Sequence, residues 1–511
     1  MTNIKFVIMR KGVIIIMILQ AFLCLNSVSA QGTSSGKSYS IDYDLWNSGG
    51  APETMIDCGS DSLFDTGNFL TLEVWARPYW TEENRKIMGK TDYDGTTFNN
   101  GYVMGFGTQD MYTEIWNPDH HTVAQSSPGP LPEDSAWMHL AVTYAYNGKL
   151  KNYLNGELIN DADVFPQNPI APGNTSFIIG EAPWGYSFVY YGDLDEVRVW
   201  NIERTQEEIR EYMFKELRGD EPGLVAYYPF NDAVDGDVPD NTANGLDGVM
   251  SGWDGNWFEW AVSFAPVGDS MMYEQTDIHA SWYGKGSQYT TLTTDNGLTM
   301  ITTIPEKDFR KYLVFGHNDL AGVSEDDLPE GAEAGYKRMN RVWYMNKGGE
   351  VFAQPLVFNL TEAADGGEEL PGDGADTLYT LLKRDSETGQ FTAVTRADNV
   401  QSSQYILFNN IELQDGFYTL GYGNCPLAVS DNIICPESID VFPNPAKDIV
   451  RIMNADHSDL YIYDITGRQV LCKKLASDME VVDLSGLGSG LYIINIMNQN
   501  STYNSKIIIE K

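Results

Sequence analysis

Short stretches of alternating apolar and polar residues, separated by turn residues, recur along most of this chain and constrain its fold more than any other feature. Residues 71–78 and 138–144 alternate with a period of two, which is the side-chain spacing on one face of a β-strand. Asn147-Gly148 and Asn155-Gly156 supply hairpin signals, because Asn-Gly favours the positive φ angles of tight turns. The pattern predicts an all-β protein of short strands.

One segment departs from this pattern and predicts a helix. Thr205 can accept a hydrogen bond from the backbone of Glu208, and the Glu208 side chain can reach back to the backbone of Thr205. This reciprocal arrangement is a capping box. Apolar contacts at Ile209 and Tyr212 extend the predicted helix to about Leu217.

The length of the chain indicates several domains. At 511 residues it is too long for one hydrophobic core, and about three domains of roughly 150 residues are expected. We divide the mature chain into strand-rich blocks at 31–253 and 254–424, a linker at 425–437 and a small last block at 438–511. Each block is predicted to be a β-sandwich, the last one small and antiparallel, and its likeness to a known family, described below, implies an Ig-like sandwich.

The first 30 residues have the three parts of a secretory signal peptide. Basic residues precede an apolar run from 13 to 25, and Val28-Ser29-Ala30 supplies small residues for cleavage. The apolar run is too short for a comfortable membrane span, and no other segment reaches its length. We therefore predict an exported protein whose mature chain has no transmembrane span.

The chain is strongly acidic. Its 72 Asp and Glu residues outnumber 33 Lys and Arg residues, which gives a formal net charge of −39. A polyanion repels nucleic acids and anionic membrane surfaces, so neither is an expected partner. The excess acid serves either solubility outside the cell or the binding of calcium, an ion that prefers oxygen ligands.

Four cysteines remain after the signal peptide, and export permits disulfides. Cys425 and Cys435 are close in sequence and flank the predicted linker, so they are the favoured pair. Four cysteines nevertheless allow three pairings, and the sequence does not choose among them. No Cys-x-x-Cys motif supports a zinc or thioredoxin-type site.

The first block resembles the laminin-G-like, concanavalin A-type jelly roll. Four stretches carry the resemblance in the family's order: TLEVWARP at 71–78, WMHLAVTYAYNGKLKNYLNG at 137–156, GDLDEVRVWNIERT at 192–205 and LVAYYPF at 224–230. The resemblance implies a two-sheet sandwich that often binds glycans or proteins and often carries a structural calcium ion.

The last block resembles the type A C-terminal sorting domain of the type IX secretion system of Bacteroidetes. The matching stretches are FPNP at 442–445, IYDITGR at 462–468, DLSGL at 483–487 and GLYI at 490–493. This resemblance implies passage through the periplasm and the type IX secretion machinery. The mature protein is then expected to be released or attached at the outer-membrane cell surface.

Calcium is the cofactor that the jelly-roll resemblance implies, in a structural role. Asp195 matches the aspartate that binds calcium in related glucanase-type jelly rolls, together with backbone oxygens of the N-terminal strand. Asp193 and Glu196 are the further candidate ligands. The alternative is that Asp195 hydrogen-bonds nearby backbone groups or pairs with Arg198.

Aromatic rings are the candidate ligand contacts, because sugars stack their C–H faces on exposed rings. Trp184 and Tyr186 flank a glycine that would leave both rings uncovered, and Trp116 lies in or beside a loop. The alternative is that these rings pack beneath long loops. Three other tryptophans are assigned to the packing of the sheets: Trp75, Trp137 and Trp200.

These features predict a non-catalytic recognition protein that binds a glycan or an extracellular protein through the jelly roll. A polysaccharide-degrading hydrolase or its accessory subunit is the alternative from another class. Retaining glycosidases need two carboxylates about 5 Å apart. Glucanases of this fold place them in a Glu-x-Asp-x-Glu run, which the sequence lacks. A structural adhesin of the cell surface is the third alternative.

Overall fold

The protein is described here by a computed structural model. The residues that it describes are 38–41, 55–79, 85–93, 98–107, 110–117, 120–125, 136–164, 168–183, 188–251, 258–282, 289–293, 297–303, 312–349, 354–372, 378–401, 404–425, 440–442, 444–453, 455, 458–464, 468–475, 479–497 and 502–511.

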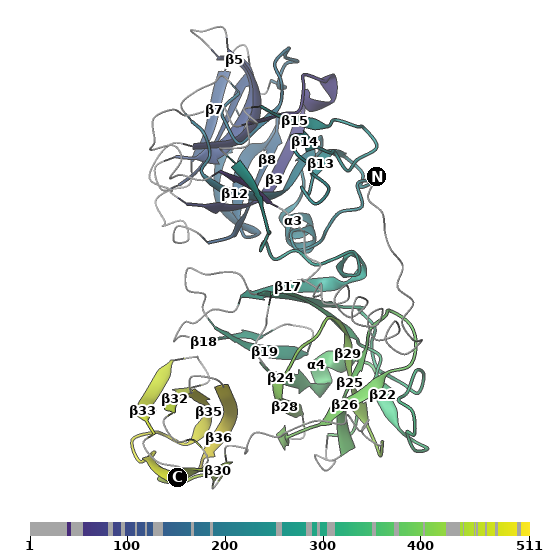
Figure 1. The fold of residues 1–511 in the computed structure, drawn as a ribbon, viewed down its shortest axis with the longest axis vertical. Helices are drawn as coiled ribbons and strands as arrows, with labels where there is room; N and C mark the ends of the chain where they lie inside the picture. The colour runs from purple at the N-terminus through teal and green to yellow at the C-terminus, as the bar shows by residue number, and fades with distance from the viewer. Residues whose placement is uncertain are drawn as a thin grey trace, which may run out of the picture.

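The described chain forms three β-sandwiches in sequence order, which confirms the predicted all-β class. Figure 1 shows the first in purple to teal at the top, the second below it in teal to green, and the third in yellow. We call them the jelly roll, the middle sandwich and the sorting domain. Among the described residues, no helix has the length and apolar character needed to cross a membrane.

Sheet A of the jelly roll has the strand order β10-β9-β8-β3-β12-β1-β16, and β13 also pairs with β12. Its strands are β1 (Ser38–Ile41), β3 (Phe69–Pro78), β8 (Met138–Ala145), β9 (Lys149–Leu154), β10 (Glu157–Asp163), β12 (Gly192–Trp200), β13 (Leu224–Tyr228) and β16 (Phe258–Ala261). The predicted Asn-Gly turn between β9 and β10 is present, with φ of 51° at Asn155 and 76° at Gly156.

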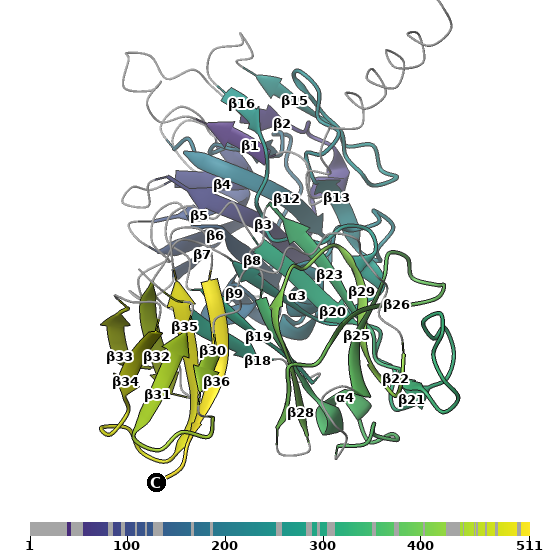
Figure 2. The ribbon, with the colours of Figure 1, turned by 60° about the horizontal axis from the view of Figure 1, so that its bottom comes forward.

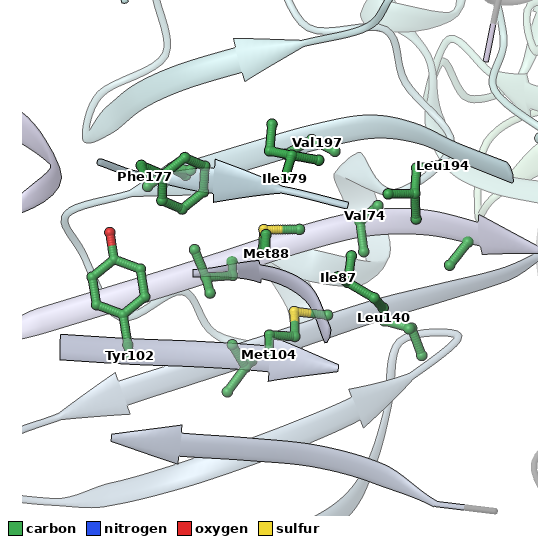
Figure 3. Packing of buried hydrophobic residues seen from close by; sticks show 14 of the residues in the cluster. Val74, Ile87, Met88, Tyr102, Met104, Leu140, Phe177, Ile179, Leu194 and Val197 are labelled. Atoms are coloured by element: carbon green, nitrogen blue, oxygen red, sulfur yellow. The ribbon is translucent and has the colours of Figure 1, made fainter. Parts of the chain in front are cut away.

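Sheet B has the order β14-β15-β2-β11-β4-β5-β6-β7. Its strands are β2 (Met55–Asp57), β4 (Arg85–Tyr93), β5 (Phe98–Phe106), β6 (Met111–Asn117), β7 (His120–Gln125), β11 (Ile178–Ile179), β14 (Asp237–Val238) and β15 (Gly248–Ser251). The core of the jelly roll lies between the two sheets. Figure 3 shows Val74 and Leu194 of sheet A beside Met88 and Met104 of sheet B, and all four are fully buried.

The jelly roll extends beyond the boundary that we placed at residue 253. Strand β16 pairs with β1 in sheet A, with Tyr39 opposite Trp260. The error has a physical reason, since β16 is short and its partner lies more than two hundred residues earlier in the chain.

Helix α3 (Gln206–Tyr212) has the predicted capping box. The Thr205 side chain accepts from the backbone of Glu208, whose carboxylate accepts from the backbone of Thr205. The helix ends before Leu217, because the chain turns into an isolated bridge between Lys215 and Gly268.

The middle sandwich also consists of two sheets. The larger contains β17 (Thr276–Trp282), β20 (Tyr312–His317), β21 (Val323–Ser324), β22 (Lys337–Met339), β23 (Trp343–Gly348), β25 (Tyr379–Arg384), β26 (Thr392–Arg396) and β29 (Gly416–Tyr422). The smaller contains β18 (Tyr289–Thr293), β19 (Leu298–Thr303), β24 (Gln354–Asn359), β27 (Asn399–Gln401) and β28 (Tyr405–Ile411), with helix α4 (Leu360–Ala364) after β24. A separate core that includes Trp343, Phe358 and Leu420 fills it.

The sorting domain pairs a three-stranded sheet with a four-stranded one. The first contains β30 (Asp440–Phe442), β31 (Ile449–Met453) and β34 (Met479–Asp483). The second contains β32 (Asp459–Asp464), β33 (Gln469–Lys474), β35 (Gly490–Met497) and β36 (Thr502–Ile509). Figure 2 shows this domain beside the middle sandwich, where β36 contacts β28.

The outer face of sheet A packs against the middle sandwich. Trp75 and Phe214 of the jelly roll share an apolar cluster with Val267, Tyr312 and Tyr344. The Trp75 indole N–H also donates to the carbonyl oxygen of Met213 at 2.7 Å. Figure 1 shows α3 between the jelly roll and β17, so the helix and the middle sandwich together cover this face.

Candidate functional site

The outer face of sheet A carries buried charges that neutralise one another. Glu73 on β3 is fully buried and accepts from Nη1 of Arg204 at 2.8 Å. The Nε2 atom of buried His139 lies 3.5 Å from its other oxygen. Burial opposes ionisation of Glu73, but Arg204 and His139 outweigh it and lower its pKa to about 2.

A second buried pair lies on the neighbouring strand. Nη2 of Arg198 lies 2.6 Å from Oε2 of Glu196, and the Tyr227 hydroxyl donates to the same oxygen at 2.7 Å. Glu196 has a φ of 54° within the bulge of β12, which turns its side chain towards Arg198. Burial alone would lower the pKa of Arg198, but the carboxylate of Glu196 raises it above its usual value.

The three predicted calcium ligands are held by protein groups instead of converging on one point. Asp193 forms an ion pair with Arg77 and accepts from the Tyr79 hydroxyl at 3.0 Å. Asp195 accepts from the backbone N–H of Glu196 at 2.8 Å and from the hydroxyl of Ser263. Ser263 belongs to the connection into the middle sandwich, so Asp195 ties that connection to sheet A.

These contacts leave a poor ligand set for calcium. An arginine beside Asp193 and another beside Glu196 each occupy carboxylate oxygens and repel a second cation. Among the residues that the structure describes, no group of three or more His, Cys, Asp or Glu side chains is arranged to hold a metal ion. The N-terminal strand, whose backbone oxygens are the other expected ligands, does lie beside β12, since Tyr39 of β1 is opposite Leu194. Calcium binding at Asp195 therefore stays a prediction.

The outer face of sheet B carries a ladder of stacked rings. Tyr93 stacks on Phe98 at a centroid distance of 4.8 Å, Phe98 on Trp116 at 4.7 Å, and Trp116 on His121 at 5.1 Å. Trp116 lies opposite Gly101, whose lack of a side chain lets the backbone of the neighbouring strand β4 approach closely. The ladder thus crosses β4 to β7.

The ladder changes the interpretation of Trp116. We expected an exposed ring in or beside a loop, but Trp116 lies in β6 and is only 5% exposed. Phe98 and His121 cover its two faces, so a sugar can stack only on the ends of the ladder. The end residues are accessible, with Tyr93 40% exposed and the His121 side chain 45% exposed. Trp184 and Tyr186 lie outside the described residues, and their role stays a prediction.

Beside the ladder is a group of polar side chains that we call the Lys86 cluster: Lys86, Asp110, Tyr112, Glu114 and His121. The Lys86 ammonium lies 4.1 Å from the centre of the Tyr112 ring. The Tyr112 hydroxyl donates to Oε1 of Glu114, which lies 3.3 Å from Nε2 of His121. Donor and acceptor groups therefore meet on one surface.

The ammonium group of Lys86 is buried within this cluster. The residue is 1% exposed, and its ammonium has no hydrogen-bond acceptor among the residues that the structure describes. Burial lowers the pKa of Lys86 to about 8, although Glu114 and Asp110 act in the opposite direction. The Tyr112 pKa is raised, first by burial and then by its hydrogen bond to Glu114.

The sequence analysis missed Lys86 and Glu114. A signal for Glu114 is present, since alternation along β6 places Tyr112, Glu114 and Trp116 on one face. No comparable signal marks Lys86, because a bulge after Lys86 shifts the register between β4 and β5.

Only one of the two cysteines of the predicted disulfide lies among the described residues. Cys425 is buried in the cluster between the jelly roll and the middle sandwich. Cys435 lies outside the described residues, so its pairing with Cys425 stays a prediction. Cys58 is a buried free thiol in the jelly-roll core, and burial raises its pKa.

Two family models match this chain. Residues 50–210 match the concanavalin A-like lectin/glucanases superfamily, and residues 440–510 match the secretion system C-terminal sorting domain. Both matches agree with the resemblances inferred from the sequence. A curated relative, an endo-acting ulvan lyase from Formosa agariphila, is 27% identical over 88 residues. That match covers 16% of this chain and 17% of the lyase.

Solved structures are similar to parts of this chain at low identity and low TM-score. A Bacteroides ovatus protein with a suggested carbohydrate-binding role is 20% identical, with a TM-score of 0.34, over 45% of this chain and 61% of that one. The heptameric pentraxin of Limulus polyphemus is 14% identical, with a TM-score of 0.27, over 34% and 81%. Domains LG4-5 of mouse laminin α1 are 9% identical, with a TM-score of 0.27, over 80% and 86%.

Proposed function

Because this chain carries a concanavalin A-like lectin/glucanase domain and a secretion-system C-terminal sorting domain, we propose that it is a secreted carbohydrate-binding protein without catalytic activity. The sorting domain indicates export, with the mature protein at the cell surface or released. Its partners are then the type IX secretion machinery during export and a glycan afterwards.

The contrast between the two outer faces of the jelly roll supports this proposal most strongly. Helix α3 and the middle sandwich occupy the outer face of sheet A, where Trp75 and Glu73 are buried. The outer face of sheet B instead combines ring ends at Tyr93 and His121 with the donor and acceptor groups of the Lys86 cluster. Aromatic faces and a few placed polar groups are what a sugar site needs.

The carboxylates support binding over hydrolysis. Hydrolysis with retention needs one carboxylic acid and one nucleophilic carboxylate near the same bond. On sheet A, Glu73 and Glu196 are each paired with an arginine and buried. On sheet B, Glu114 accepts from Tyr112 and lies beside His121.

The test is a binding screen of the mature chain against soluble polysaccharides, run with calcium and again with a chelator. Tyr93→Ala and His121→Ala each remove an end ring and are expected to weaken binding about tenfold. Tyr405→Ala is the matched control, since Tyr405 is 38% exposed but lies in the middle sandwich. Binding lost only with the chelator would support the calcium prediction.

Two outcomes would overturn the proposal. A folded protein that binds no polysaccharide but still mediates cell attachment would favour the structural adhesin. The release of reducing ends or unsaturated products from any bound polysaccharide would establish an enzyme, and the partial likeness to an ulvan lyase makes that assay necessary.

A further inference from the structure

The described surroundings of Lys86 do not satisfy the hydrogen-bonding capacity of its ammonium group. An ammonium group has three donors, and a buried one without acceptors costs free energy. The ring of Tyr112 stabilises the charge, since a cation over an aromatic face is attracted by its quadrupole. It supplies no lone pair, however. Within the described part of the chain the Lys86 ammonium therefore lacks hydrogen-bond acceptors, which a ligand can provide.

The neighbours of Lys86 restrict the chemistry of that ligand. Glu114 and Asp110 are the charged groups that face it, both from the β5–β6 side, so the cluster has more negative than positive charge. A sulfate or carboxylate would gain the attraction of Lys86 but meet the repulsion of both acids. It would also approach a chain with a formal net charge of −39.

A sugar hydroxyl can accept a hydrogen bond from Lys86 without bringing a negative charge near the two acids, and it can also donate a hydrogen bond. One hydroxyl of a neighbouring pair can accept from Lys86 while the other donates to Glu114. Tyr112 lies between these two residues, in contact with both. It is only half-buried, and a change of its rotamer would open the approach, with the hydroxyls of the ligand replacing the contacts that Tyr112 makes with Lys86 and Glu114.

We infer that the Lys86 cluster is a sugar subsite on the outer face of sheet B that takes a neutral, hydroxyl-rich glycan, with Lys86 as hydrogen-bond donor and Glu114 as acceptor. The inference rests on the proposed carbohydrate binding and adds the class of ligand and the residues that select it. The exposed ring of His121 places the ladder at the edge of the same subsite.

The test compares neutral polysaccharides with sulfated and uronate-containing ones, using the mature full-length chain. Neutral glycans are expected to bind, and Lys86→Met and Glu114→Gln are each expected to lower their affinity about tenfold. Lys506→Met is the matched control, because burial also lowers the pKa of Lys506 to about 8, but in the sorting domain. Circular dichroism and melting curves establish that each variant is folded.

A pH profile separates recognition by the charge of Lys86 from a merely structural role. Affinity for the neutral glycan is expected to fall as pH rises through about 8, where Lys86 loses its proton. Lys86→Arg keeps its charge at high pH, so it is expected to retain binding there. Tyr112 stays protonated across this range because its pKa is raised.

The outcomes distinguish the two proposals. Binding confined to anionic polysaccharides, or an affinity unchanged in Lys86→Met and Glu114→Gln, would overturn the neutral subsite while carbohydrate binding stands. A folded wild-type chain that binds no polysaccharide would overturn the proposed function itself, and the subsite with it. Loss of affinity in Lys86→Met together with the pH profile would support the subsite.

Discussion

The two outer faces of the jelly roll bury cations in opposite ways. On sheet A, Arg198 lies 2.6 Å from Glu196, and Arg204 lies 2.8 Å from Glu73. On sheet B, no described residue accepts a hydrogen bond from the ammonium of Lys86. All three cations are buried. The pKa of Arg198 is raised by its partner Glu196, whereas burial lowers the pKa of Lys86.

The difference indicates what each face is for. The face of sheet A is an internal surface, in which paired charges hold α3 and the middle sandwich in place. The face of sheet B contains a buried ammonium that contacts the Tyr112 ring but has no hydrogen-bond acceptor among the described residues. Departures from the rule that buried charges are paired are expected at functional sites. Substitutions on the two faces should therefore have opposite effects on stability.

The largest effect is expected from Glu73→Ala on sheet A. Removal of this carboxylate leaves Arg204 buried and unpaired, which should lower the free energy of unfolding by about 3–5 kcal/mol. Glu203→Ala is the control, because Glu203 pairs with Lys151 near the surface, and exposed pairs contribute about 0–1 kcal/mol. Urea unfolding measures both, and equal losses would mean that the face of sheet A is not an internal surface.

Lys86→Met on sheet B should do the reverse and raise the free energy of unfolding by about 1–3 kcal/mol at pH 7. The folded pKa of about 8 lies below the usual 10.5, so the folded chain holds fewer protons than the unfolded one between these values. Wild-type stability should therefore rise with pH across that window, and the variant should lose this rise. Lys149→Met, at an exposed site, is the control. A destabilised Lys86→Met would show that Lys86 has a structural role.

A smaller loss is expected at the connection between the jelly roll and the middle sandwich. Ser263→Ala removes the hydroxyl that donates to Asp195 and accepts from the backbone of Ala265. The buried carboxylate is then incompletely satisfied, at a cost of about 1–2 kcal/mol. Ser386→Ala removes an exposed hydroxyl bond and serves as the control. An unchanged melting temperature for Ser263→Ala would indicate that another group, such as a calcium ion, satisfies Asp195.

Local patterns predicted the elements of this fold because they depend on residues close in sequence. The capping box of Thr205 and Glu208 and the Asn155-Gly156 turn both involve neighbours along the chain. Alternation in residues 71–78 likewise predicted β3. The two family models confirm the resemblances that such stretches carry.

The candidate site could not be predicted in the same way, because its geometry depends on strand pairing and on packing between sandwiches. Trp116 is covered by Phe98 and His121, which register places beside it from neighbouring strands. Asp195 meets Ser263, which lies 68 positions later in the chain. A carboxylate that binds a metal and one that anchors a segment look alike in sequence, since the partner decides between them.

The smallest predicted effect is a pH dependence of stability at the connection between the jelly roll and the middle sandwich. Glu216 lies at this connection, because its backbone N–H donates to the carbonyl oxygen of Gly268. Burial and the charge of Glu196 raise the pKa of Glu216 to about 7, although the hydrogen bond from Asn231 acts in the opposite direction. The folded chain keeps this proton between the usual 4.5 and about 7, so its contribution to stability falls as pH rises through that window.

Glu216→Gln should remove this fall and stabilise the protein above pH 7 by on the order of 1 kcal/mol. Many acids titrate between pH 4.5 and 7 in this chain, so the difference between variant and wild type is the quantity to measure, by urea unfolding at several pH values. Glu211→Gln, with an exposed side chain, is the matched control. A difference that does not change with pH would mean that Glu216 is ionised within the contact, and that the outer face of sheet A tolerates an unpaired charge as sheet B does.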